Sequence, residues 1–190
     1  MKHPWLAAGI TIGLSFLTLP AHGSDVLVVA PGKVAGLRMG ASTQDAKRGG
    51  WIKWDQTCST WTTGPRTYRT TPRGGEVFKA FPEKVRAGHI LSMWATGDVV
   101  TSKGIRAASL RSGRAGSGLA ALRRTYPNLQ RLGWWAPGAD WQISEDVYTV
   151  GSRQKGWLDF YVDTETRRVS MMLIRDDAVS WRAFKGADGC

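Results

Sequence analysis

Side chains that bind metals or that serve as partners for nucleophiles are scarce in this chain of 190 residues, which has two cysteines and three histidines. Because His3 and His22 lie in the signal peptide predicted below, a Ser-His-Asp or Cys-His arrangement in the mature chain would depend on His89, which follows Ala87-Gly88 at the expected start of a strand. The nucleophile motif Gly-x-Ser-x-Gly is absent, and the glycines at 113, 116 and 118 lack the Gly-Lys-Ser/Thr of a phosphate loop. We therefore expect a non-enzymatic protein without metal or cofactor.

Acidic residues are also few, because 26 lysines and arginines stand against 15 acids, a net charge of +11. No acid occurs between Asp98 and Asp140, an interval that contains Lys103, Arg106, Arg111, Arg114, Arg123, Arg124 and Arg131. On one side of a domain these charges would attract anions, and arginine suits phosphate and carboxylate geometry. The alternative is a solvated face that only maintains solubility.

Apolar runs of spanning length are missing as well. Met1-Lys2-His3 precedes the nearly uncharged residues 5–19, and Pro20-Ala21-His22-Gly23 offers small residues before a cleavage site. This pattern predicts a secretory signal peptide over residues 1–23, since the apolar run is shorter than the roughly 20 residues that span a bilayer. An uncleaved anchor is the alternative; we expect a secreted or extracytoplasmic protein with no membrane span.

The two cysteines, Cys58 and Cys190, form an even pair in a chain that is expected to be exported. Disulfides persist outside the cytoplasm, so we predict one bridge between them. The alternative is a free thiol at Cys190.

Apolar and charged residues, at 42% and 22%, indicate a folded chain with an internal duplication. Residues 36–46 (GLRMGASTQDA) combine a short apolar segment with Ser42 as a helix cap, and residues 104–106 (GIR) repeat the opening. Gly116-Ser117 would cap a second helix that ends at Pro127, with residues 108–114 as an insertion.

After each expected helix, apolar and other residues alternate with a period of two. Leu158, Phe160 and Val162 alternate with polar and aromatic residues, and Val169, Met171 and Leu173 return, which predicts a hairpin with one buried face. The first half has a weaker equivalent: residues 77–81, a turn around 82–88, then Ile90, Ser92 and Trp94. Residues 57–68 and 142–150 are further candidate strands.

These patterns predict an α+β fold of two helix-plus-antiparallel-sheet repeats, 24–97 and 98–190, packed as one unit because each half alone buries little apolar surface. Residues 34–42 (VAGLRMGAS), 95–97 (ATG), 101–106 (TSKGIR) and 119–127 (LAALRRTYP) resemble small secreted bacterial tandem-repeat proteins with a β-lactamase inhibitory protein-like fold. The resemblance implies architecture; no inhibitory contact residue maps onto this chain.

Paired carboxylates leave one enzymatic alternative open. Glu145-Asp146, Asp159 with Asp163, or Asp176-Asp177 could flank a glycosidic bond in a cell-wall hydrolase. We instead expect Asp159 and Asp163 on the polar face of their hairpin, and Asp176 and Asp177 at a strand end.

Tryptophan is abundant, with ten residues. Most are expected in the core, whereas Trp134, Trp135 and Trp141 fall in an expected Gly/Pro-containing loop after the basic helix. Tryptophans beside arginines are typical interface anchors, although loop tryptophans also cap sheets.

Charge and aromatic content without a catalytic constellation favour a binding module for an acidic protein or an anionic cell-envelope polymer. Its predicted binding residues are Arg106, Arg111, Arg114, Arg123, Arg124, Trp134 and Trp135. Extracellular nucleic-acid binding is a second hypothesis, which the expected export disfavours.

Overall fold

The computed structural model describes residues 27–56, 59–64, 68–70, 76–78, 80–95, 99–109, 113–136 and 144–183. The expected signal peptide, Cys58, Cys190, Arg111 and Trp141 lie outside these residues. Within the described ranges, no helix has the length and apolar character needed to cross a membrane.

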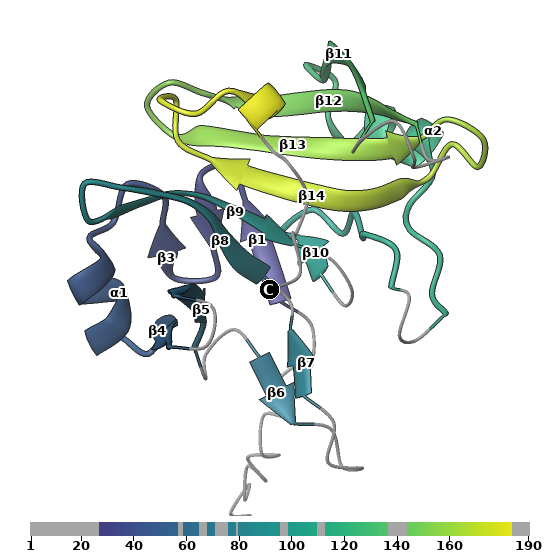
Figure 1. The fold of residues 1–190 in the computed structure, drawn as a ribbon. Helices are drawn as coiled ribbons and strands as arrows, with labels where there is room; N and C mark the ends of the chain where they lie inside the picture. Colours follow the sequence, from purple (N-terminus) through teal and green to yellow (C-terminus); the bar gives the residue numbers. More distant parts are fainter. Residues whose placement is uncertain are drawn as a thin grey trace, which may run out of the picture.

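The largest element is a six-stranded antiparallel sheet with the order β11-β12-β13-β14-β9-β8 (Figure 1). Its strands are β8 (Ala80–Arg86), β9 (His89–Ala95), β11 (Gln130–Trp135), β12 (Glu145–Ser152), β13 (Gly156–Asp163) and β14 (Val169–Arg175). β9 pairs with β14, with Trp94 opposite Leu173. The hairpins expected in two separate repeats therefore lie in one sheet.

Three smaller sheets complete the described strands. One has the order β10-β1-β2-β3, in which β1 and β10 run parallel. Its strands are β1 (Leu27–Ala30), β2 (Lys33–Val34), β3 (Leu37–Arg38) and β10 (Val99–Thr101). The other two are hairpins that pair β4 (Ile52–Asp55) with β5 (Thr60–Thr63) and β6 (Tyr68–Thr70) with β7 (Glu76–Phe78).

Both described α-helices are short. In α1 (Thr43–Arg48) the Ser42 hydroxyl accepts a hydrogen bond from the backbone N–H of Asp45 at 3.1 Å, which confirms the predicted cap. α2 (Leu119–Thr125) begins after Gly118 and has no side-chain cap. The predicted cap at Ser117 is wrong, because its hydroxyl accepts instead from the backbone N–H of Arg106 at 3.0 Å. A 3₁₀ turn, η1 (Trp181–Ala183), follows β14.

The predicted α+β fold class is wrong, because the protein is mostly β, with helices of only six and seven residues. The strands that the sequence did not predict lie in segments where polar and apolar residues do not alternate. β2 and β3 have two residues each and β10 has three, which is too short for alternation to be recognised.

The turn of the first expected hairpin is also shorter than predicted. Pro82 lies within β8, and the connection to β9 is Ala87-Gly88, with φ angles of 47° and 74°. Two consecutive positive φ angles are typical of the two-residue turns that match the twist of paired strands. The hairpin β13–β14 is confirmed, but its single buried face is wrong, because Asp159, Phe160 and Tyr161 are all fully buried.

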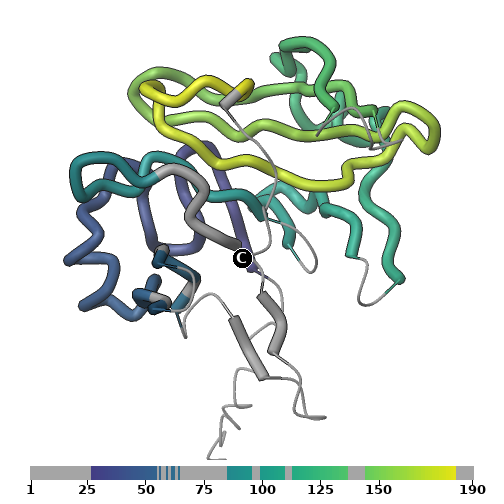
Figure 2. The backbone as a smooth tube through the Cα atoms, in the orientation of Figure 1, coloured from purple at the N-terminus to yellow at the C-terminus, as the bar shows by residue number. Residues whose placement is uncertain are grey.

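One continuous core joins β1, β9, α2 and the central strands of the six-stranded sheet on one face of that sheet. The tube view shows the purple β1–β3 segment and the teal strand β9 against the green and yellow strands (Figure 2). Gly32, in the β1–β2 turn, touches Gly156 so closely that a Cβ on Gly156 would lie 2.6 Å from the Gly32 Cα. The N–H of Gly32 also donates to the Trp157 carbonyl at 3.2 Å. Glycine at both positions thus lets the smaller sheet dock onto the larger one.

Candidate functional site

The basic helix α2 lies on the core face of the six-stranded sheet. Leu119 and Leu122 are buried, and the ring of Tyr126 packs 5.5 Å from that of Phe160 on β13. The helix therefore presents Arg123 and Arg124, both exposed, at the margin of the sheet. The Arg123 guanidinium stands 5.9 Å from the centre of the Tyr148 ring on β12.

Trp134 and Trp135 form the end of strand β11 rather than a loop, so that part of the prediction is wrong. Trp134 pairs with Asp146 of β12 and Trp135 pairs with Glu145. Because neighbouring residues of a strand point to opposite faces, the two rings separate. Trp135 packs 5.3 Å from the ring of Tyr161 on the face opposite α2, whereas Trp134 is 60% exposed.

Two arginines hold the carboxylate of Asp146 on the α2 side of the sheet. Arg131 of β11 donates to Oδ1 at 2.7 Å through Nη2 and at 3.2 Å through Nε, and Arg167 donates to Oδ2 at 3.1 Å. Burial alone would raise the pKa of Asp146, but these bonds from Arg131 and Arg167 lower it below its usual value. The acid-free interval from Asp98 to Asp140 is therefore compensated in part, because Asp146 of β12 pairs with its Arg131 across the two strands.

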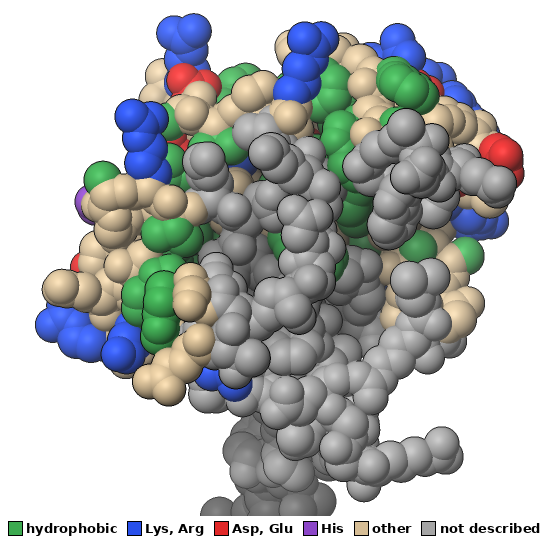
Figure 3. Space-filling model, viewed as in Figure 1, with side chains coloured by type: hydrophobic (Ala, Val, Ile, Leu, Met, Phe, Trp, Pro, Cys, Tyr) green, Lys and Arg blue, Asp and Glu red, His purple; other side chains and the backbone are tan. Residues whose placement is uncertain are grey.

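These residues make one contiguous basic surface, which we call the α2–β11 surface: Arg123, Arg124, Arg131, Trp134 and Arg167. Two of its four guanidinium groups, those of Arg131 and Arg167, bind the carboxylate of Asp146, and their side chains remain 56% and 48% exposed. Figure 3 shows lysine and arginine side chains along the whole upper edge of the molecule, where Figure 1 places the six-stranded sheet.

Other predicted binding residues lie elsewhere. Half-buried Arg106 is bridged to Val100 and bonded to Ser117, before the start of α2. Exposed Arg114 is bridged to Ser109 in the preceding loop. Arg111 lies outside the described residues, as does the predicted disulfide between Cys58 and Cys190.

Arg167 was missed as a member of the surface. It lies in the turn between β13 and β14 at a φ of 56°, and only the pairing of β13 with β12 brings it to Asp146. The only signal in the sequence was a pair of adjacent arginines, Arg167 and Arg168, at the expected hairpin turn. Nothing in the sequence indicates that Arg167 lies close to Asp146.

The opposite face of the sheet contains a buried glutamate. Glu145 is 2% exposed, and Ser170 donates its hydroxyl to Oε1 of Glu145 and lies 3.0 Å from the Tyr161 carbonyl oxygen. Ser170 is the unpaired residue of a β-bulge, which turns its side chain toward Glu145. Burial raises the pKa of Glu145 to about 7, although the hydrogen bond from Ser170 opposes the rise.

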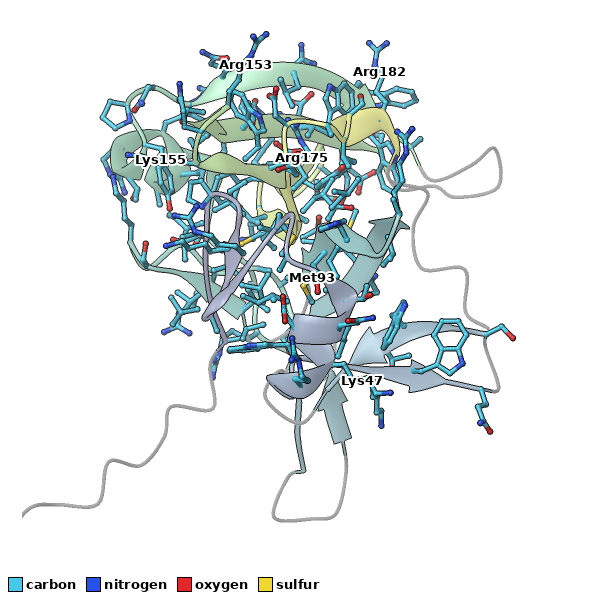
Figure 4. All side chains as sticks on the ribbon, turned by 90° about the vertical axis from the view of Figure 1, so that its left-hand side faces the viewer. Lys47, Met93, Arg153, Lys155, Arg175 and Arg182 are labelled. Carbon is cyan, nitrogen blue, oxygen red and sulfur yellow. The ribbon has the colours of Figure 1, made fainter. Side chains whose placement is uncertain are left out.

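Asp159 lies on that same face in a closed ion pair with Arg175. Its Oδ2 accepts from the Arg175 Nε at 2.5 Å, and its Oδ1 accepts from the Thr149 hydroxyl at 2.6 Å. Figure 4 shows Arg175 and Met93 inside the molecule, while Lys47, Arg153, Lys155 and Arg182 point outward. The expectation that Asp159 lies on a polar hairpin face is therefore wrong.

Of the three carboxylate pairs in the hydrolase alternative, the pair of Asp159 with Asp163 loses its first acid to this arrangement. Both oxygens of Asp159 are bonded and the residue is 0% exposed, so it presents no carboxylate to a substrate. Asp163 accepts from the backbone N–H of Thr166 at 2.6 Å, within its turn. Asp177 accepts from the indole N–H of Trp157 at 2.9 Å, and Asp176 accepts from the backbone N–H of Ala178 at 2.9 Å.

His89 is exposed at the start of β9, and its Nδ1 lies 2.9 Å from the carbonyl oxygen of Gly40. Its contact is thus to the main chain of the β3–α1 connection. In the described part of the chain, no group of three or more His, Cys, Asp or Glu side chains is placed to hold a metal ion.

We find no match to the chain among protein-family models, curated proteins or solved structures. The resemblance to the β-lactamase inhibitory protein-like fold therefore stays a prediction, and the function is argued from the geometry.

Proposed function

We propose that the protein is a secreted, non-enzymatic binding module whose α2–β11 surface binds an anionic partner, either an acidic protein or an anionic cell-envelope polymer. The observation that carries the proposal is the exposed ring of Trp134 beside the Arg131–Asp146–Arg167 network on one face of the sheet. Tryptophan and arginine are both among the residues enriched in binding hot spots.

The ion pairs with Asp146 hold the two guanidinium groups in place before a partner arrives. Arg131 uses Nε and Nη2, and Arg167 uses Nη1, so each keeps further N–H groups for an external anion. A group that is already ordered loses less conformational entropy on binding. Arg123 and Arg124 add positive potential, which increases the rate of encounter with an acidic partner.

A charge-reversal pair with a matched control tests this proposal. We expect the variant Arg123→Glu with Arg124→Glu to lose about tenfold or more of its affinity for immobilised polyglutamate at low salt, because the new negative charges repel the negatively charged ligand. The control, Lys33→Glu with Lys155→Glu, makes the same change in net charge at exposed positions near the other end of β12. We expect it to retain most of the affinity.

The salt concentration that elutes each variant is the measurement, with thermal unfolding as a check that all variants are folded. Equal loss in both double variants would mean that net charge alone drives retention. Unchanged retention of the α2 variant would reject the α2–β11 surface.

A further inference from the structure

β11 is an edge strand. In the six-stranded sheet it pairs with β12 on one side, and no other described strand pairs with its second side. Such an edge offers main-chain N–H and C=O groups to which another extended chain can pair. The binding surface proposed above thus includes a hydrogen-bonding edge as well as charged side chains.

A bulge in β11 places an arginine and a tryptophan on the same face of this edge. The register runs from Arg131 opposite Tyr148 to Gly133 opposite Val147, so Leu132 is the extra residue. Residues three apart in a regular strand point to opposite faces, but here Arg131 and Trp134 lie opposite Tyr148 and Asp146, which share a face. A strand alongside β11 would therefore meet a guanidinium and an indole on one side.

The other face of β11 is already occupied. The ring of Trp181 covers Gly133, where a Cβ would lie 3.1 Å from it, and Leu132 and Trp135 pack with Val147, Tyr161 and Leu173. These contacts hold the edge strand in the extended conformation that a pairing partner requires. The exposed side of the strand is then the one that carries Arg131 and Trp134.

Charge decides which chain can occupy the edge. A second copy of this protein would bring the four arginines of its own α2–β11 surface close to the same four residues, and in each copy Asp146 pairs with only two of them, Arg131 and Arg167. Like charges directly opposite each other destabilise strand pairs, whereas opposite charges stabilise them. An acidic extended segment satisfies both the main-chain groups and the arginines, and a glycan could satisfy only the arginines.

We propose that β11 binds an extended acidic peptide segment of a partner protein as an added strand, with an acidic side chain at Arg131 and an apolar one against Trp134. This inference rests on the proposed function and names the partner class for its surface. Main-chain pairing provides the affinity, and the two side-chain contacts set the register.

The test compares three peptides of identical charge: one with the repeat Glu-Thr-Val-Thr, in which Glu and Val alternate along one face of the strand, and two versions of it that are N-methylated at alternate residues, one on each edge of the strand. Fluorescence anisotropy of the labelled peptides measures binding to the full-length protein. We expect methylation of one edge to weaken binding about tenfold or more, because it removes the pairing N–H groups, while methylation of the other edge has little effect. Polyphosphate serves as a polyanion that cannot form a strand.

Trp134→Ala is expected to weaken binding of the unmodified peptide about tenfold or more, since exposed tryptophans often anchor interfaces. Trp54→Ala is the matched control, because Trp54 is 47% exposed on the separate β4–β5 hairpin.

The outcomes separate the two proposals. If both methylated peptides bind as well as the parent, strand addition is wrong and the proposed anion-binding function stands. Concentration-dependent dimerisation that Trp134→Ala abolishes would make a second copy the occupant and overturn the inference. If neither peptides nor polyphosphate bind at low salt, the proposed function itself fails.

Discussion

Replacing Asp159 with asparagine is expected to reduce the free energy of unfolding by about 3 to 5 kcal/mol, because it leaves the Arg175 guanidinium buried without a counter-charge. Arg175 has 9% of its side chain exposed and Asp159 has none. The Nη1 of Arg175 also donates to the Val179 carbonyl at 2.9 Å, and the guanidinium lies 5.4 Å from the centre of the Trp157 ring. The ion pair therefore ties the segment after β14 to the sheet.

A double-mutant cycle separates the ion pair from simple packing. We expect Asp159→Asn and Arg175→Met each to be strongly destabilising, whereas the double variant is more stable than the sum of the two losses predicts, because no unpaired charge remains. Urea unfolding of the four proteins measures this coupling. Additive losses, or single losses below about 1 kcal/mol, would contradict the account of the buried pair.

Replacing Glu145 with glutamine is expected to remove most of the pH dependence of stability between pH 4.5 and about 7. The Ser170 hydroxyl has one proton but lies within bonding distance of two acceptors, Glu145 Oε1 and the Tyr161 carbonyl. A protonated Glu145 resolves the shortage, because it can donate to Ser170 while Ser170 donates to Tyr161. Glutamine supplies the same donor at every pH.

The sign of the effect follows from proton linkage. Burial raises the pKa of Glu145 in the folded protein to about 7 from 4.5, so the folded state binds more protons than the unfolded state between these values. Its stabilising contribution is complete below pH 4.5 and is lost as the pH rises toward 7. The loss amounts to at most about 3 kcal/mol.

Chemical denaturation across this pH range, with Glu165→Gln as control, measures the contribution. Glu165 is an exposed glutamate in the β13–β14 turn, and we expect its variant to follow the wild type. Two results would contradict the claim that Glu145 is buried in its neutral form. One is a wild-type free energy of unfolding that rises between pH 4.5 and 7 and does not rise in Glu145→Gln; the other is a pH profile of Glu145→Gln that runs parallel to that of the wild type.

Local patterns in the sequence predicted the local elements well. Period two over residues 158–173 gave the β13–β14 hairpin, and Ser42 gave the start of α1. The shortest strands carry too few residues for any periodicity, so the mostly β architecture was missed. Alternation also predicted that Asp159 lies on a polar face. In the structure Arg175 pairs with Trp157, two residues before Asp159, and both charged side chains are buried; the sequence does not show this pairing.

The candidate surface was predicted in part for the same reason. Arg123, Arg124 and Trp134 follow one another along the chain, so their shared region could be read from the acid-free interval. Arg167 belongs to the surface because it forms an ion pair with Asp146. Trp135 does not belong to it, because strand alternation places its side chain on the opposite face of the sheet. Both facts depend on strand register, which is a tertiary property.

Residue-level mapping of ligand contact tests the central claim most directly. Titration of the isotope-labelled protein with the acidic Glu-Thr-Val-Thr peptide should shift the NMR signals of the β11 amides, the Trp134 indole and the Arg131 and Arg167 guanidinium groups, while those of the β4–β5 hairpin stay in place. Shifts confined to Trp54 and its neighbours, or spread evenly over every exposed lysine and arginine, would show that the anionic partner is held elsewhere or by charge alone.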